Sequence, residues 1–151
     1  MPDQKPVSTI VFDVNETLLD ITTLEPLFAR VFGDASVLRE WFAELILYSQ
    51  TMTLSGRYAP FGALAGGVLQ MVGANKGVTI SDEDVAELKS LIGSMPAHPD
   101  VAPALRKLRE AGFRLVTLTN SPPSPAPTPL EKAGIADFFD RSFSVDEVEK
   151  F

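Results

Sequence analysis

The sequence of 151 residues contains no cysteine and a single histidine, His98. Without cysteine there can be no disulfide bond, no thiolate nucleophile and no cysteine-based zinc site. The single histidine argues against a histidine-rich metal site and against a Ser-His-Asp triad. A catalytic or binding site therefore has to be built from other residue types.

Basic residues are also scarce. The sequence has 13 Lys and Arg and 20 Asp and Glu, which gives a net charge of -7. Nucleic-acid binding needs a concentrated basic surface, so no nucleic-acid partner is expected. No apolar run approaches the roughly 18 to 20 residues that cross a bilayer. The first residues, MPDQKPVS, lack the layout of a secretory signal. We expect no membrane partner and a cytoplasmic location.

Apolar residues make up 45% of the sequence, enough for one domain with a buried core. A run of β-branched and aromatic residues predicts a buried strand from Val7 to Val14. An amphipathic helix is expected from about Val101 to Ala111, followed by a strand from Arg114 to Thr119. A third strand is expected from about Arg141 to Val145. This order of helices and strands predicts a parallel α/β sheet.

The residues between the first and second strands have helical periodicity. One helix is expected to begin near Ser36, and a second is expected within YAPFGALAGGVLQMV. A third, SDEDVAELKSLIG, has Ser81 as its N-cap and ends at Gly93. We interpret residues 18–97 as an all-helical cap inserted into a core formed by 1–17 and 98–151. After the second strand, a proline-rich loop leads to a short helix that begins at Thr128.

Polar residues follow two of the predicted strands. Asp13 ends the first strand, and Thr119, Asn120 and Ser121 end the second. Ligands of open α/β sheets bind at the carboxyl ends of the strands. By its position alone, Asp13 could be a helix cap or a nucleophile. A carboxylate nucleophile needs hydrogen-bond donors, which Thr17, Thr119 and Asn120 can supply.

Three segments, FDVNETLLD, TLTNS and HPDVAPALRKLREAGFRLVTLTNS, resemble motifs of the haloacid dehalogenase superfamily. Within that superfamily, the chain is similar to the type II (S)-2-haloacid dehalogenases. The resemblance implies an α/β fold with a Rossmann-like parallel-sheet core, incomplete at about three strands, and an inserted all-helical cap.

The resemblance implies that Asp13 attacks the halogen-bearing carbon of a short (S)-2-haloacid, the expected partner. The resulting aspartyl ester is then hydrolysed to a 2-hydroxyacid. Arg39 matches the arginine of the cap that lies near the substrate carboxylate and the departing halide. Asn15, Phe61, Thr119 and Asn120 are expected to contact substrate, and Thr17 to assist Asp13. No metal and no organic cofactor is implied.

The residue type at position 15, Asn in this chain, distinguishes two kinds of enzyme within the superfamily. Related phosphatases typically have an aspartate at this position, which protonates the leaving group and helps to organise magnesium. A halide leaves without a proton, so Asn15 favours cleavage of a carbon–halogen bond. The alternatives are a phosphatase that acts on a small phosphate ester and a noncatalytic remnant that binds a partner.

Four aromatic residues of the cap, Trp41, Phe42, Tyr58 and Phe61, either line an apolar pocket or pack within the cap. Phe61 is the pocket candidate by its family position. His98 is expected to be a connector between cap and core.

The family's catalytic lysine follows an aromatic residue after the third strand. Here Phe151 stands at the position of that aromatic, and Lys150 lies two positions before the expected lysine. We expect a truncated chain with weak or no activity and with its first strand at an exposed edge. Because many such dehalogenases pair through their caps, a homodimer is also among the expectations.

Overall fold

The computed structural model describes residues 8–151. Among these residues, the strands β1 (Thr9–Phe12), β2 (Arg114–Thr119) and β3 (Arg141–Ser144) form a three-stranded sheet in the order β1-β2-β3. Both pairs of neighbouring strands are parallel. The predicted parallel α/β core of about three strands is therefore confirmed.

The first and third strands are shorter than expected. Val7 lies outside the described residues, and β1 ends at Phe12, directly before Asp13. Val14 has left the strand, because its carbonyl oxygen accepts hydrogen bonds from the amides of Leu18 and Leu19 at 2.9 and 3.0 Å. Beyond β3, Val145 begins the 3-10 helix η3 (Val145–Glu147). Each strand thus ends in a turn at the same edge of the sheet.

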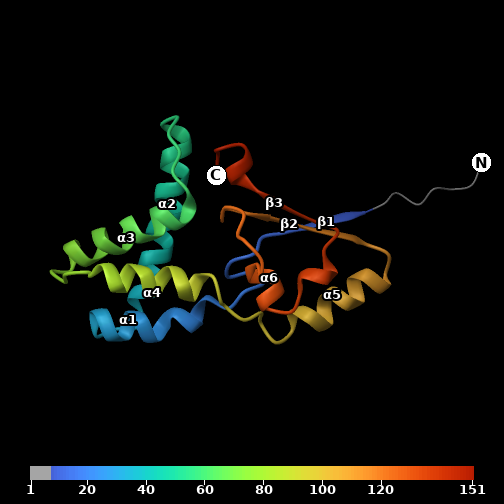
Figure 1. Cartoon of the computed structure of the whole chain (residues 1–151), viewed down its shortest axis with the longest axis horizontal. Helices are drawn as coiled ribbons and strands as arrows, with labels where there is room; N and C mark the ends of the chain where they lie inside the picture. Colours follow the sequence, from blue (N-terminus) through green and yellow to red (C-terminus); the bar gives the residue numbers. More distant parts are fainter. Residues whose placement is uncertain (1–7) are drawn as a thin grey trace, which may run out of the picture.

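Two helices, α5 (Val101–Glu110) and α6 (Pro129–Lys132), cover one face of the sheet (Figure 1). On that face the side chains of Leu115 and Thr117 in β2 are fully buried. Val11 and Leu118 point to the opposite face and are 58% and 45% exposed. Val116, on the same face, is buried, so the described residues leave only part of the second sheet face open to solvent.

Four longer helices lie together beside the sheet, at the left of Figure 1: α1 (Glu25–Phe32), α2 (Val37–Leu54), α3 (Phe61–Asn75) and α4 (Asp82–Ile92). The 3-10 helix η1 (Ile21–Leu24) leads into α1, and η2 (Ala136–Phe138) lies between α6 and β3. Trp41 of α2 is the largest fully buried side chain, and its indole N–H donates to the carbonyl oxygen of Ala65 at 3.1 Å. The helices thus pack around a core of their own side chains.

The helices predicted near Ser36, within residues 58–72 and after Ser81 correspond to α2, α3 and α4, although α3 begins at Phe61, after Pro60. Helix α1 was not predicted from the sequence. Its signals are Pro26 in the first turn, the buried pair Leu27 and Phe28, and Gly33 in a left-handed conformation at its end. With eight residues, α1 has only about two turns, which is too short a stretch for its helical periodicity to stand out.

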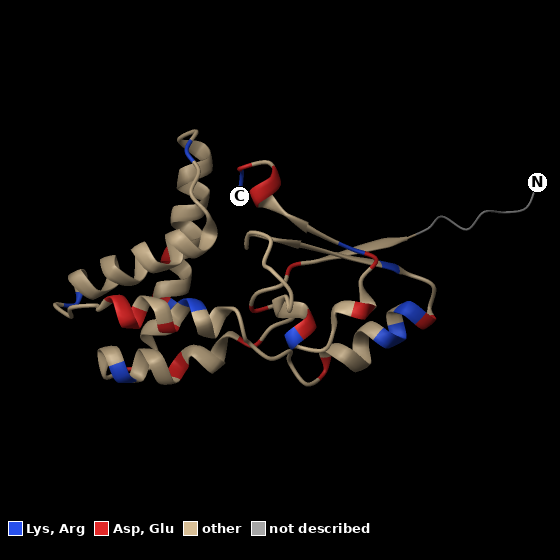
Figure 2. Ribbon diagram, viewed as in Figure 1, with Lys and Arg blue, Asp and Glu red and all other residues tan. Residues whose placement is uncertain are grey.

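Capping interactions explain where α4 and α6 begin. The Ser81 hydroxyl accepts from the amide of Asp84 at 3.1 Å, and the Asp84 carboxylate accepts from the Ser81 amide at 3.0 Å. Thr128 and Glu131 form the same reciprocal pair at the start of α6. The acidic first turn of α4, visible in Figure 2, also suits the positive end of a helix dipole.

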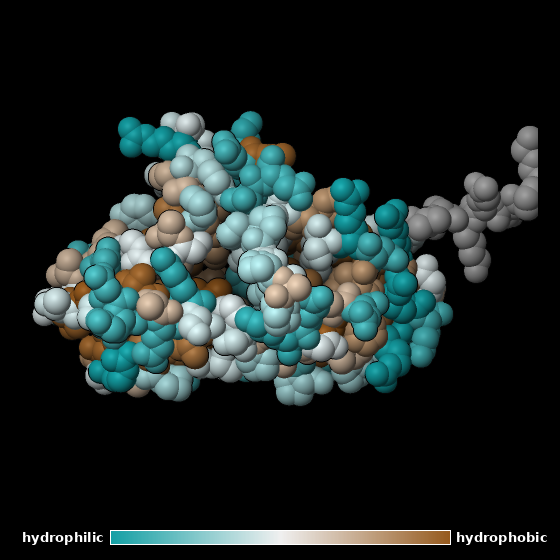
Figure 3. All heavy atoms as spheres, viewed as in Figure 1, coloured by the Kyte–Doolittle hydropathy of each residue, from teal (hydrophilic) through white to brown (hydrophobic). Residues whose placement is uncertain are grey.

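The molecular surface is mixed in character. Figure 3 shows polar side chains surrounding smaller apolar areas on both the helical side and the sheet side. Within residues 8–151, none of the helices combines the length and the apolar character needed to span a bilayer.

Candidate active site

Asp13 stands at the carboxyl end of β1 with its side chain exposed. The hydroxyl of Thr17 donates a hydrogen bond of 2.8 Å to Asp13 Oδ2. This contact depends on the tight turn after β1, in which Glu16 has φ of 69° and its amide donates to the carbonyl oxygen of Leu19 at 2.9 Å. The turn returns Thr17 to the carboxylate four residues earlier in the chain. The structure therefore brings Asp13 and Thr17 together, as the motif predicted.

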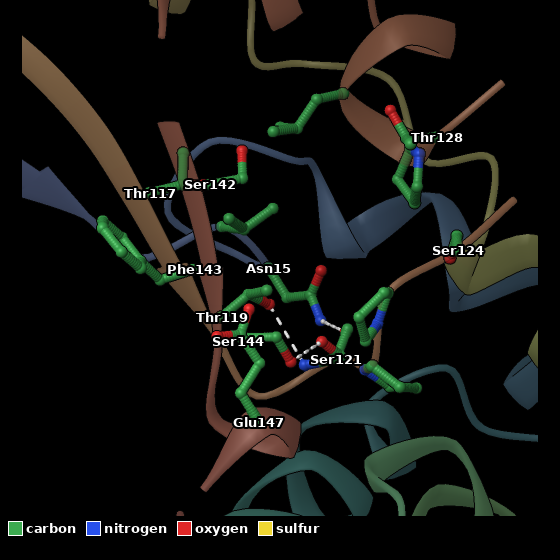
Figure 4. A pocket seen from close by; sticks show the side chains of 15 residues that line it. Asn15, Thr117, Thr119, Ser121, Ser124, Thr128, Ser142, Phe143, Ser144 and Glu147 are labelled. Carbon is green, nitrogen blue, oxygen red and sulfur yellow. Dashed lines mark hydrogen bonds between the residues drawn. The ribbon is translucent and has the colours of Figure 1, made fainter. Parts of the chain in front are cut away.

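A second contact joins the ends of β1 and β2. Asn15 Nδ2 donates to Ser121 Oγ at 3.2 Å, and the amide of Ser121 donates to Thr119 Oγ1, also at 3.2 Å. These bonds appear as dashed lines in Figure 4. Asn120, half-buried between Thr119 and Ser121, is at the same strand end. The two predicted polar strand ends thus meet at one edge of the sheet.

A cavity of about 290 Å³ opens beside Asn15 (Figure 4). Its wall is rich in hydroxyl groups and prolines, and is formed by Val14, Asn15, Thr117, Thr119, Ser121, Pro122, Pro123, Ser124, Thr128, Pro129, Leu130, Ser142, Phe143, Ser144 and Glu147. Thr117 Oγ1 is buried there without a hydrogen-bond partner in the described part of the chain. Asp13 is not part of this wall, although the next two residues, Val14 and Asn15, belong to it, as do Pro122 and Pro123 of the proline-rich loop.

A second, much smaller cavity of about 10 Å³ is lined by Asn15 together with apolar side chains of the helical layer, the part of the chain from η1 to Met95 that contains α1 to α4. These side chains are Ile21, Trp41, Phe42, Leu45, Phe61, Ile92 and Met95. Three of the four aromatic residues of the cap, Trp41, Phe42 and Phe61, therefore lie around one small cavity that includes Asn15, and Trp41 and Phe61 are also buried by packing. Tyr58 does not line it.

Tyr58 contacts the end of the chain instead. Its ring stacks on Phe151 with centroids 5.3 Å apart, and its hydroxyl donates to Asp146 Oδ1. Burial, followed by the hydrogen bond to Asp146, raises the pKa of Tyr58 to about 12. Tyr58 is thus a protonated donor over the whole neutral range.

Arg39 projects from the first turns of α2 and forms an ion pair with Glu16. The side chains of Arg39 and Glu16 are 57% and 39% exposed. Because Glu16 stands between Asn15 and Thr17, this ion pair ties the start of α2 to the turn that carries the predicted site. Glu16 was not among the predicted site residues, although its place inside the first motif was a signal.

His98 also holds this turn. Its Nε2 lies 3.0 Å from the carbonyl oxygen of Glu16, and its amide donates to the carbonyl oxygen of Leu18 at 3.0 Å. These contacts agree with the connector role that was predicted for it. Among residues 8–151, no group of three or more His, Asp or Glu side chains is arranged to hold a metal ion.

Residues 7–151 match the family described as haloacid dehalogenase-like hydrolase. The chain belongs to this family. Two (S)-2-haloacid dehalogenases are similar to it along most of its length. The enzyme of Pseudomonas sp. strain CBS-3 is 29% identical over 146 residues, which cover 95% of this chain and 64% of that protein. The enzyme of Pseudomonas putida is 27% identical over 150 residues, covering 97% and 66%.

The fold is similar as well. An L-2-haloacid dehalogenase from Xanthobacter autotrophicus superposes with a TM-score of 0.85 at 26% identity, covering 96% of this chain and 59% of that one. The chain thus spans just under two thirds of the length of these relatives. The haloacid dehalogenase fold predicted from the sequence motifs is confirmed.

Proposed function

We propose that this chain carries the nucleophile of a hydrolytic dehalogenase, which converts short-chain (S)-2-haloacids to 2-hydroxyacids. The observation that carries the proposal is Asp13 at the end of β1, held by Thr17 and accompanied by an amide, Asn15, in place of a second acid. The similar proteins with (S)-2-haloacid dehalogenase in their names support the same substrate class.

In the first step, an oxygen of the Asp13 carboxylate attacks the halogen-bearing carbon from the side opposite the halogen. The carbon–halogen bond breaks, the halide leaves with the bonding electrons, and the configuration at carbon is inverted. Thr17 donates to Oδ2, and the other oxygen, Oδ1, is the proposed attacking atom. No proton is transferred to the leaving group, which is why an amide at position 15 suffices.

In the second step, water attacks the carbonyl carbon of the aspartyl ester. The ester bond breaks, the 2-hydroxyacid is released, and the Asp13 carboxylate is restored with loss of one proton. The oxyanion that develops on the ester needs nearby donors. Thr119 and Asn120, at the neighbouring end of β2, are our candidates for this role.

Arg39 is the proposed partner of the substrate carboxylate, because a guanidinium can donate two parallel hydrogen bonds to it. Phe61 and Asn15 both line the small apolar cavity and are proposed to contact the carbon chain and halogen of the substrate. A cavity of about 10 Å³ holds no more than one water molecule, so it has to widen for a haloacid to enter. In this proposal residues 18–97 form the cap that supplies Arg39 and Phe61. Residues 1–17 and 98–151 form the core that supplies Asp13.

The proposal is tested by incubating the purified chain with (S)-2-chloropropionate in the presence of a chelator. Released chloride and the configuration of the lactate are measured, and peptide mass spectrometry is used to find an ester on Asp13. We expect the ester to form, and to be absent from Asp13→Asn. Hydrolysis of a phosphate ester that requires magnesium, with no ester on Asp13 from the haloacid, would instead support the phosphatase.

A further inference from the structure

A series of hydrogen bonds runs across the ends of all three strands. It begins with Asn15, whose Nδ2 donates to Ser121 Oγ at 3.2 Å. Ser144 Oγ, at the end of β3, donates to the carbonyl oxygen of Ser121 at 2.7 Å and accepts from the amide of Asp146 at 3.1 Å. Asn15, Ser121 and Ser144 lie together in Figure 4. Asn15 is thus linked to η3 through side chains and backbone of β2 and β3.

The series continues from the core into the helical layer. Asp146 accepts a hydrogen bond from the hydroxyl of Tyr58, which lies between α2 and α3 and 88 residues earlier in the chain. Three further contacts support this connection. Phe151 stacks on Tyr58, its ring lies 5.9 Å from that of Phe61, and its amide donates to Thr53 Oγ1 at 2.9 Å.

Asn15 is therefore connected to Tyr58 by two routes. One is the hydrogen-bonded route through Ser121, Ser144 and Asp146. The other is a packing route, because Phe61 contacts Phe151 and also lines the small cavity shared with Asn15. Both routes lead from Tyr58 to Asn15, which contacts the substrate in the proposed function.

We propose that Tyr58 and Asp146 are positioning residues, which hold the helical layer against the strand ends and thereby fix the orientation of the Asn15 amide. They touch no reacting atom in this proposal. With one Asn15 N–H bound to Ser121, its amide cannot turn its oxygen toward β2 without losing that bond. The inference rests on the proposed function only for the importance of Asn15, since the contacts themselves do not depend on turnover.

The test follows the side-chain amide signal of Asn15 in nitrogen-15 NMR spectra of the intact chain, assigned from its loss in Asn15→Asp. We expect Tyr58→Phe and Asp146→Asn to shift this signal and to accelerate hydrogen exchange at the Phe151 amide by about threefold to tenfold. The double variant should match the single variants, because both remove the same bond. Tyr48→Phe, in the other tyrosine of the chain, should change neither signal.

Ser144→Ala provides an independent arm. It interrupts the hydrogen-bonded route between Ser121 and Asp146 but keeps the stacking of Phe151 on Tyr58 and its bond to Thr53, so the Asn15 signal should shift while exchange at Phe151 changes less than in Tyr58→Phe. An unchanged Asn15 signal in Tyr58→Phe, Asp146→Asn and Ser144→Ala would overturn the proposal. So would a loss of fold in all three, since the residues would then be needed for folding and not for positioning. No haloacid is needed, so this result stands apart from any failure to detect dehalogenation.

Discussion

The guanidinium of Arg39 is paired with the carboxylate of Glu16, one residue away from both Asn15 and Thr17. The Glu16 carboxylate is therefore bound to the same guanidinium that, in the proposed function, binds the carboxylate of the substrate. Glu16 reaches this place from a left-handed backbone conformation, with φ of 69°, which non-glycine residues seldom adopt. Substrate binding at Arg39 therefore competes with this ion pair.

Replacing Glu16 by Gln should therefore strengthen carboxylate binding. An ion pair this exposed contributes about 0.2 to 1 kcal/mol, so the dissociation constant for the unreactive analogue propionate should fall by roughly 1.5-fold to fivefold. Isothermal titration or NMR titration measures it. Glu44→Gln removes the same charge from α2 and serves as the control. Weaker binding to Glu16→Gln than to Glu44→Gln would mean that Glu16 assists substrate binding.

The hydrogen bond from Thr17 to Asp13 leads to a second prediction. The Thr17 hydroxyl fixes the orientation of the Asp13 carboxylate, and a displaced nucleophile attacks more slowly, so Thr17→Val should slow formation of the Asp13 ester by roughly 10-fold to 100-fold. The rate can be followed by mass spectrometry at saturating haloacid. Thr51→Val, on the surface of α2, should leave the rate unaltered. A rate within a factor of two of the parent's would show that Thr17 does not position the nucleophile.

Two glycines of α3 should respond in opposite directions to alanine. A Cβ at Gly73 would lie 2.5 Å from Ile80 Cγ1 and 2.9 Å from the carbonyl oxygen of Val78. Gly73→Ala should lower the free energy of unfolding by about 1 to 3 kcal/mol. Gly67 has open space around it, so Gly67→Ala should raise that free energy by about 0.5 to 1 kcal/mol through helix propensity. Urea unfolding followed by Trp41 fluorescence measures both, and equal effects would contradict the packing described for α3.

The capping box of α4 should make stability depend on pH. Hydrogen bonds from the Ser81 amide and hydroxyl, assisted by Arg30, hold the pKa of Asp84 below its ordinary value of 3.8. A carboxyl with a lowered folded pKa stabilises the protein above its unfolded pKa, and this stabilisation is lost as the pH falls through the folded value.

Asp84→Asn should therefore lower the free energy of unfolding by about 1 to 2 kcal/mol at pH 7. The difference from the parent should narrow as the pH drops below about 4. Asp82→Asn, in the same helical turn, is the control for loss of charge alone. A difference as large at pH 3 as at pH 7 would show that ionisation of Asp84 does not contribute.

Local patterns in the sequence were enough to predict much of this structure. The strand before Asp13, the start of α4 at Ser81 and the start of α6 at Thr128 all depend on residues within one turn or one strand of each other. The contact between Asp13 and Thr17 also lies within a single motif. Such short-range features can be predicted directly from the spacing of residue types along the chain.

The remaining contacts join residues far apart in the chain. Glu16 and Arg39 are 23 positions apart, and Tyr58 and Asp146 are 88 apart. No spacing rule connects them, because their distance is set by how the helical layer lies on the strand ends. The two cavities beside Asn15 likewise arise from tertiary packing, and the sequence could name aromatic candidates for one of them but not its size.

The open face of the sheet has a practical consequence. Val11 and Leu118 present apolar side chains to water, and β1 has a strand on one side only among the described residues. Both features favour self-association through backbone hydrogen bonding and apolar contact. The degree of self-association then depends on protein concentration. Rates and affinities should therefore be measured over a dilution series before they are assigned to a single molecule.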